Sequence, residues 1–188
     1  MKMTAATQVQ KKRKPLLSVR QIGVAAAFGG AAAAVMILNI TVPFGPGLSL
    51  DLGEIFVSLG AALGGPVAGI IIGFLKGIGA GPERNIPPHM LVGCVWGFWY
   101  AFLWKYTANR ANGKWIRIGL WTITMPIYYY VFLLPLLFWI YTTVTLNVPF
   151  WPFFTTVAPL VIPEMIGTTI VTDIVWLVLP AKFAAPVK

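Results

Sequence analysis

Residues 51–78 read DLGEIFVSLGAALGGPVAGIIIGFLKGI, an apolar run that acidic residues open and Lys76 closes. Gly64, Gly65 and Pro66 interrupt this run near its middle. Glycine adds backbone freedom, proline lacks an N–H and clashes with the preceding turn, and the residue before proline avoids the helical region. The stretch therefore predicts a tight hairpin of two short helices rather than one continuous helix.

The composition places the chain among helical membrane proteins. Hydrophobic residues make up 58% of the chain and charged residues only 10%, whereas a soluble domain carries about 25% charged residues. Four windows contain no Asp, Glu, Lys or Arg: 21–50, 55–75, 85–104 and 118–163. Because about 20 apolar residues cross the hydrocarbon core, we expect an all-α polytopic membrane protein.

The basic residues distinguish between two topologies. If 55–75 were a single span, five spans would leave eight basic residues inside and six outside. If 51–80 is a two-helix hairpin, six spans put twelve basic residues inside and leave only Lys76 and Arg84 outside. Cytoplasmic loops carry the excess of Lys and Arg. This distribution of basic residues therefore favours six transmembrane helices with both termini in the cytoplasm. It also accounts for the net charge of +9 without a nucleic-acid partner.

The boundaries of the six helices follow from the same pattern. We expect them at 18–42, 52–64, 66–79, 88–106, 115–141 and 154–180. The second and third would be about 20 Å long, too short to cross a core of about 30 Å. They should be buried among the longer helices or meet a thinned, water-accessible cavity.

The segments outside these helices divide the chain further. The outer connections are rich in Gly, Pro and Asn, which predicts turns; they are 43–51, 80–87 and 142–153. We expect three domains: a basic, disordered cytoplasmic N-terminus (1–14), the membrane domain that binds the substrate (15–182) and a cytoplasmic tail (183–188).

Two segments of the chain carry patterns typical of a known family. Leu50-Asp51 precedes Gly65-Pro66-Val67-Ala68-Gly69, and the last apolar segment has Pro-Glu at 163–164 and Leu-Pro at 179–180. The first segment resembles the Leu-Asp opening and the GP-x-x-G turn into the third helix of the substrate-binding S component of energy-coupling factor (ECF) vitamin transporters. The second resembles that family's last helix. The resemblance implies a subunit that captures a vitamin-like solute from outside, together with a transmembrane coupling subunit and two ATPase subunits.

The first apolar segment carries small residues at helical spacing. The registers are Ala25/Gly29/Ala33, Ala26/Gly30/Ala34 and Ala27/Ala31. Such spacing lets helix backbones approach closely inside lipid. The resemblance implies that one such face docks the coupling subunit, and Ala27 and Ala31 are our candidates for it. The alternative is packing within this bundle.

Charged residues near the outer end are candidates for a solute site. Asp51 and Glu54 have the spacing of a capping box, so Glu54 is the stronger candidate for contact with a solute. Lys76 either turns outward, pairs with a carboxylate or binds an anionic group. Glu164 lies deep in an apolar stretch, where a carboxylate is usually functional or paired, and Lys76 is one possible partner. Asp173, nine residues later, should face the opposite side.

Four uncharged or aromatic residues complete the candidate site. His89 and Trp99 belong to one predicted helix and are expected to line a ligand pocket together. Tyr128 begins a run of three tyrosines, of which at least one should face inward. Asn147 is expected to close over the ligand from an outer loop, together with Trp151, for which anchoring at the membrane interface is equally plausible.

The sequence shows no catalytic constellation. G-x-S-x-G, H-E-x-x-H and Walker A motifs are missing, and these carry the common hydrolase, zinc and ATPase chemistries. His89 and Cys94 are five residues apart, a poor spacing for shared metal ligands. We therefore expect no enzyme activity, no cofactor and no metal, and any ATP-driven step would require separate chains.

These observations lead to one expected function and two alternatives. We expect a subunit in the plasma membrane that binds a small organic micronutrient within the lipid bilayer. Four acids in the outer half against two basic residues favour a neutral or cationic ring compound. The alternatives are a non-catalytic accessory or assembly subunit of a larger membrane complex, and an independent facilitator or channel.

Overall fold

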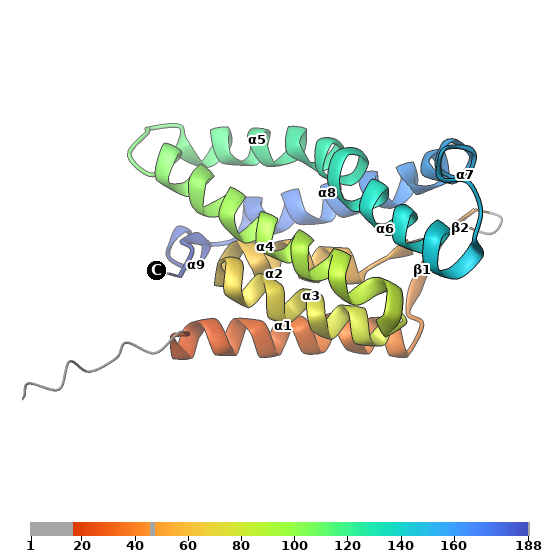
Figure 1. The fold of residues 1–188 in the computed structure, drawn as a ribbon. Coiled ribbons are helices and arrows are strands. Elements are labelled where there is room, and N and C mark those ends of the chain that lie inside the picture. Colours follow the sequence, from red (N-terminus) through yellow and green to blue (C-terminus); the bar gives the residue numbers. More distant parts are fainter. Residues whose placement is uncertain (1–16, 46–47, 188) are drawn as a thin grey trace, which may run out of the picture.

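Residues 17–45 and 48–187 are described by the structure, a computed structural model (Figure 1). The predicted N-terminal domain 1–14 lies outside these residues. Four helical stretches of the described chain are long and apolar enough to cross a membrane: Val19–Ile37, Asn85–Thr107, Gly113–Val144 and Phe150–Val178. The prediction of a helical chain with apolar, membrane-compatible spans is therefore confirmed.

The elements follow one another in this order: α1 (Val19–Ile37), β1 (Thr41–Gly45), β2 (Leu48–Asp51), α2 (Gly53–Gly64), α3 (Pro66–Gly79), α4 (Pro82–Thr107), α5 (Gly113–Ile127), α6 (Leu134–Ile140), α7 (Phe150–Val157), α8 (Ile162–Val178) and α9 (Ala181–Ala184). π-Helical turns join α5 to α6 at Tyr128–Leu133 and extend α6 at Tyr141–Leu146, and a 3₁₀ turn at Ala158–Val161 joins α7 to α8. The start of α1, the α4–α5 connection and α9 lie at one end of the bundle (Figure 1). The β-hairpin and the connection to α7 lie at the other, which we call the outer end.

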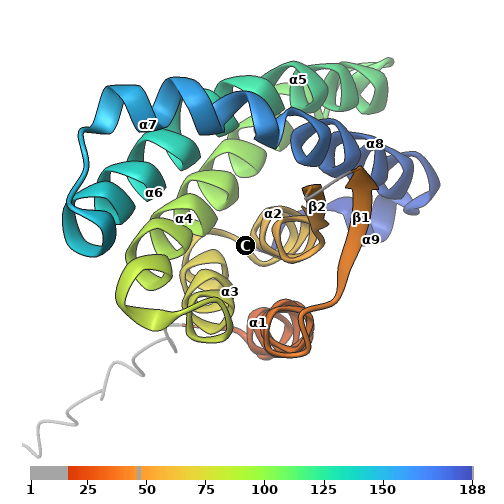
Figure 2. The ribbon, with the colours of Figure 1, turned by 90° about the vertical axis from the view of Figure 1, so that its right-hand side faces the viewer.

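The short helices α2 and α3 form the hairpin that the Gly-Gly-Pro sequence predicts. Gly65 ends α2 with φ +82°, a conformation that glycine adopts readily. Pro66 is the first residue of α3, where its missing N–H costs no helical hydrogen bond. Ten of the 12 residues of α2 are buried, and α2 lies among α1, α3, α4 and α8 (Figure 2). The expectation that both short helices are buried among longer ones is confirmed for α2, whereas α3 leaves Phe74 and Ile78 exposed.

Glycines at four-residue intervals bring α3 unusually close to α4. A Cβ on Gly69 would lie 2.1 Å from the carbonyl oxygen of Gly93, and one on Gly73 would lie 2.0 Å from that of His89. Gly77 makes a similar approach, since a Cβ there would lie 2.5 Å from Cα of Ile86. Small residues at this spacing let helix backbones touch inside lipid. This glycine seam fixes the backbone of His89 against α3.

The two halves of the bundle differ in packing. The backbones of α1 to α4 lie close together over most of their lengths, whereas α5, α6 and α8 approach them closely at fewer points. The second half reaches the first mainly through large side chains, such as Trp121, which stacks on Trp96 with ring centroids 4.3 Å apart. The helices α1 to α4 are therefore held together by backbone contact. The helices α5, α6 and α8 are held against them mainly by contacts between side chains.

The small residues of α1 divide between two surfaces. The buried ones are Ala25, Gly29 and Ala32. Ala27 is exposed and Ala31 is half-buried, and a Cβ on Gly30 would meet no atom within 4 Å. The register that begins at Ala25 thus packs inside this bundle, while the Ala27 register reaches its surface.

The first outer connection contains a β-hairpin that was not expected. α1 ends at Ile37 rather than at 42, and β1 and β2 then pair antiparallel, with Thr41 opposite Asp51. The expectation of a non-helical connection is correct for its described residues, 43–45 and 48–51, but strand pairing replaces the expected turns there. The hairpin returns the chain directly to the start of α2 and so positions Asp51.

The other two outer connections are more helical than predicted. α4 already begins at Pro82, and the amide of Asn85 donates to the carbonyl oxygens of Ala80 and Gly81. In the segment 142–153 the helix continues to Leu146 and α7 starts at Phe150. Proline is compatible with a first helical turn, whose N–H groups have no partner within the helix. A prediction from Gly and Pro content alone therefore overestimated the length of these loops.

The tail after residue 182 packs on the inner end of the bundle. Its first residues belong to α9, and the hydroxyl of Tyr100 donates to the carbonyl oxygen of Ala184 at 2.8 Å. Arg20 donates to the carbonyl oxygen of Ala185, and the N–H of Val187 donates to that of Leu63. The expected boundary at 183 is therefore not a boundary of the packed structure.

Candidate functional site

A buried ionic cluster lies where α2 begins and α3 ends. Nζ of Lys76, which is fully buried, lies 2.7 Å from Oδ2 of Asp51 and also pairs with Oε1 of Glu54. Because α2 and α3 are antiparallel, the first turn of one meets the last turn of the other. Oδ1 of Asp51 accepts from the N–H of Gly53 at 2.6 Å. Of the possibilities left open for Lys76, the structure shows pairing with carboxylates.

Glu54 connects this cluster to the rest of the bundle. Its Oε2 accepts a hydrogen bond from the hydroxyl of Tyr128 at 3.2 Å, and its Oε1 lies 3.2 Å from Nδ1 of His89. All three side chains are buried. The expected capping box does not form, since α2 has no side-chain cap and Glu54 turns instead towards Lys76.

His89 has unused hydrogen-bonding capacity. Although its Nδ1 is close to Glu54, the geometry gives no directed hydrogen bond, and this buried nitrogen has no other partner in the described part of the chain. A buried polar atom without a partner is rare in native structures. His89 is held in this position because its backbone is in contact with Gly73 across the glycine seam.

Glu164 stands apart from the lysine. Its Oε1 lies 3.3 Å from the hydroxyl of Tyr129, which also lies 3.2 Å from Oγ1 of Thr168. Among the side chains that the structure describes, the ion pairs within 4.0 Å involve only Asp51, Glu54, Lys76 and His89. The pair of Glu164 with Lys76 considered from the sequence therefore does not form, because Lys76 is taken up by two other carboxylates.

A cavity of about 200 Å³ joins these groups, and we call it the outer cavity. Its polar lining comes from Asp51, Glu54, Asn85, His89 and Glu164. Its apolar lining comes from Met36, Ala80, Leu133, Leu134, Leu137, Phe138 and Val161. The structure thus brings together Glu54, His89 and Glu164, three separately predicted candidates, with Lys76 behind Glu54.

The π-helical turn at Tyr128–Leu133 supplies the tyrosines of the site. Tyr128 and Tyr129 are adjacent in sequence, yet both are buried and reach Glu54 and Glu164 respectively. Turns of this type often occur at functional sites. Tyr128 was a predicted site residue and Tyr129 was not, since three consecutive tyrosines carry no signal that ranks them. Asp51 was predicted mainly as a helix cap.

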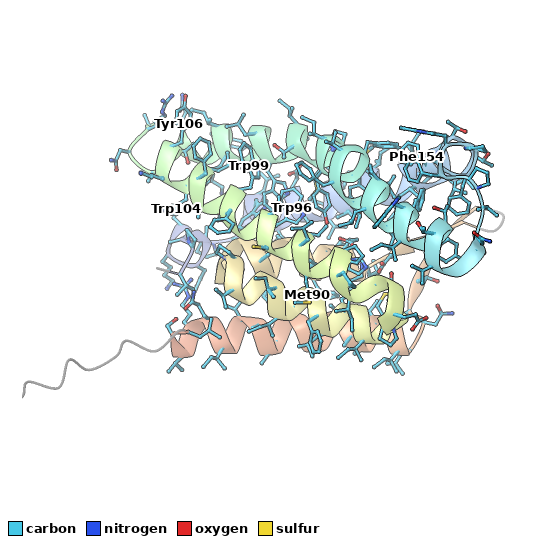
Figure 3. All side chains as sticks on the ribbon, viewed as in Figure 1. Met90, Trp96, Trp99, Trp104, Tyr106 and Phe154 are labelled. Atoms are coloured by element: carbon cyan, nitrogen blue, oxygen red, sulfur yellow. The ribbon has the colours of Figure 1, made fainter. Side chains whose placement is uncertain are left out.

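Trp99 does not share a cavity with His89, contrary to expectation. It lines a separate, apolar cavity of about 320 Å³ with Trp96 and Tyr128, between α4 and α5. Figure 3 shows Trp96 and Trp99 following one another along α4. Ten residues of helix separate His89 from Trp99 by about 15 Å along the axis, too far for one small ligand.

Three further candidates lie away from the outer cavity. Asn147 is exposed in a left-handed turn with φ +51°, and Trp151 is 70% exposed. Neither lines the cavity, and Trp151 lies at the surface, as an interface anchor would. Closure of Asn147 over a ligand stays a prediction. Asp173 accepts from the hydroxyl of Thr122 at 2.8 Å and does not share a site with Glu164, as expected.

Comparisons with known proteins give no relative. No protein-family model matches the chain, and neither a curated protein nor a solved structure matches it. The outer cavity, with its buried charges and apolar wall, is therefore the main basis for a functional assignment. Its chemistry suits recognition of a small molecule, because convergent polar groups in an apolar pocket fix the orientation of a ligand.

Proposed function

We propose that the chain is a membrane-embedded solute-binding subunit of an ECF-type importer, which captures a small organic micronutrient from outside the cell. The observation that carries this proposal is the outer cavity. It combines Glu54, His89 and Glu164 with an apolar wall, a typical composition for a small-molecule site. Intramembrane ionisable residues are functional candidates by default, because burial without a role is destabilising.

The proposed topology has six spans in the plasma membrane, with both termini in the cytoplasm. Basic residues support it, because Arg20, Lys105, Lys114 and Lys182 belong to elements that meet at the inner end (Figure 1). Lys76, by contrast, is buried towards the outer end and is neutralised there. An excess of Lys and Arg marks the cytoplasmic side, so the outer cavity would face the outside.

The proposed partners are a transmembrane coupling subunit and two ATPase subunits. The exposed face of α1 supports a docking role, since Ala27 is exposed and Gly30 has open space beside it. A helix face without bulky side chains allows close approach of another helix in lipid. ATP hydrolysis on the partner chains would then drive release of the captured solute to the cytoplasm.

Mass spectrometry of small molecules released from the purified protein tests the proposal. The protein is extracted in detergent, denatured, and compared with Glu164→Gln and with Glu83→Gln, which makes the same change at an exposed residue outside the cavity. We expect a stoichiometric small molecule from the parent and from Glu83→Gln, and its loss from a folded Glu164→Gln. An empty parent that binds no vitamin from a panel would instead favour an accessory or assembly subunit.

A transport assay separates the importer from an independent facilitator. Vesicles that contain only this chain should bind the released solute without accumulating it, because the proposal assigns the driving force to ATPase partners. Equilibration of the solute across such vesicles, in the absence of any partner or ATP, would contradict the importer and support a facilitator.

A further inference from the structure

The described charges in and directly behind the outer cavity do not balance. With a neutral His89 beside Glu54, Lys76 faces two carboxylates, Asp51 and Glu54, so one negative charge of that group is left over. Glu164 adds a second carboxylate, whose described partner is an uncharged tyrosine hydroxyl. A buried carboxylate needs a cation or several hydrogen bonds to remain charged. Among the described side chains, a charged Glu164 therefore has no cationic partner within 4.0 Å.

A second, independent feature also indicates a missing ligand. His89 is 4% exposed, lines the same cavity, and its Nδ1 has no hydrogen-bond partner among the described residues. Such a nitrogen can pair with a polar substituent of a bound molecule. Glu164 and His89 belong to α8 and α4, so a ligand that contacts both would bridge the two halves of the bundle.

We propose that the solute is a cation, a single-ring compound with a protonated or quaternary nitrogen that pairs with Glu164. This inference rests on the proposed function and specifies its substrate class. His89 binds a second polar atom of the solute, and Tyr129 holds the carboxylate of Glu164 in place as a positioning residue. Lys76 does not contact the solute, because it lies behind Glu54 and does not line the cavity.

Size and lining agree with this class of solute. A volume of about 200 Å³ is equivalent to roughly seven water molecules at about 30 Å³ each, the scale of one substituted ring. Leu133, Leu137 and Phe138 offer apolar surface for such a ring. A bare metal ion fits less well, because the described residues contain no group of three His, Cys, Asp or Glu side chains placed to hold one.

Three probes of the same size and shape test the charge of the solute. Benzamidine is a cation at neutral pH, benzamide is neutral and benzoate is an anion, and all three have the same number of non-hydrogen atoms. Their dissociation constants are measured by isothermal titration calorimetry on the detergent-purified, solute-depleted protein. We expect benzamidine to bind at least about tenfold more tightly than benzamide, as one charge-assisted hydrogen bond predicts, and benzoate to bind most weakly.

Matched variants locate the preference for a cation. Glu164→Gln keeps the shape and the hydrogen bond from Tyr129 but removes the charge, and should abolish the difference between benzamidine and benzamide. Glu83→Gln should retain it. Tyr129→Phe, which leaves the carboxylate in place, should reduce the difference only in part and provides a second test should Glu164→Gln fold poorly.

The outcomes separate this inference from the proposed function. Equal or tighter binding of benzamide or benzoate, or a preference unchanged in Glu164→Gln, overturns the cationic solute while leaving solute capture intact. If no probe binds but a native molecule is released, a positive charge on that molecule supports the inference, and a neutral or negative one overturns it. A protein that neither releases nor binds a small molecule contradicts both proposals.

Discussion

Replacing Lys76 with methionine tests the ionic cluster most directly. Methionine is also unbranched and of similar length, so the change removes the charge and leaves most of the packing. Lys76 is fully buried, the side chain of Glu54 is 2% exposed and that of Asp51 is 25% exposed. Removal of one partner from a buried ion pair costs about 3–5 kcal/mol, because the other charge is left uncompensated.

The lower part of that range applies here. Water reaches Asp51, so its carboxylate is partly solvated after the substitution, whereas that of Glu54 is not. We therefore expect Lys76→Met to lower the free energy of unfolding by about 3 kcal/mol. The double variant Lys76→Met/Glu54→Gln should recover a large part of this loss, since it removes the buried charge that Lys76 neutralised.

Reversible unfolding in mixed micelles of increasing SDS content measures these differences. The eight tryptophans report unfolding by fluorescence, and the two single variants with the double variant form a double-mutant cycle. Lys105→Met is the control, because Lys105 is exposed and such a change usually alters stability by less than about 0.5 kcal/mol. The cluster would be refuted as a stabilising unit if Lys76→Met were no worse than this control, or if Glu54→Gln gave no recovery.

Three further predictions follow from the packing and from the site. Gly69→Ala should destabilise the protein by about 1–3 kcal/mol, the usual effect of overpacking, because its Cβ would lie 2.1 Å from a backbone oxygen of α4. The control is Gly30→Ala, which has open space around it and should be neutral or slightly stabilising in the same SDS titration. Tyr128→Phe should cost about 1.5–3 kcal/mol in that assay, since it removes a hydrogen bond to a charged group, and no loss would argue against the contact with Glu54. Asn147→Ala should leave the amount of released solute unchanged in mass spectrometry, and a loss would place Asn147 in the site after all.

The helical hairpin was predictable because its cause is local. Gly65 and Pro66 act on the backbone within one or two residues of themselves, so the break appears at the position that the sequence indicates. The ends of the outer helices were harder to place. Proline lowers the expectation of a helix wherever it occurs. Pro82 nevertheless starts α4, and α7 starts at the aromatic residue Phe150.

The candidate site was predictable in its residues but not in its grouping. Glu164 and Glu54 stand out because carboxylates are rare in apolar segments. The pairing of Lys76 with Glu54 depends on the antiparallel contact of α2 and α3. The position of Trp99 outside the outer cavity depends on the length of α4. The π-helical turn, which brings in Tyr129, leaves no recognised pattern in the sequence. The glycine seam of α3 was not predicted, because the longest run of small residues in the sequence lies in α1.

The unequal packing of the two halves has a consequence for the kinetics of a bound solute. The wall formed by Asp51, Glu54 and His89 lies on the half that is held by backbone contact, and His89 cannot shift relative to α3 without opening the glycine seam. The wall formed by α6 and α8 is held by side chains and by tyrosine hydroxyls, which break and re-form more easily. We therefore expect the first wall to contribute most to selectivity and the second to set the residence time. Substitutions in α6 should then change how fast a solute is exchanged without changing which solute is chosen.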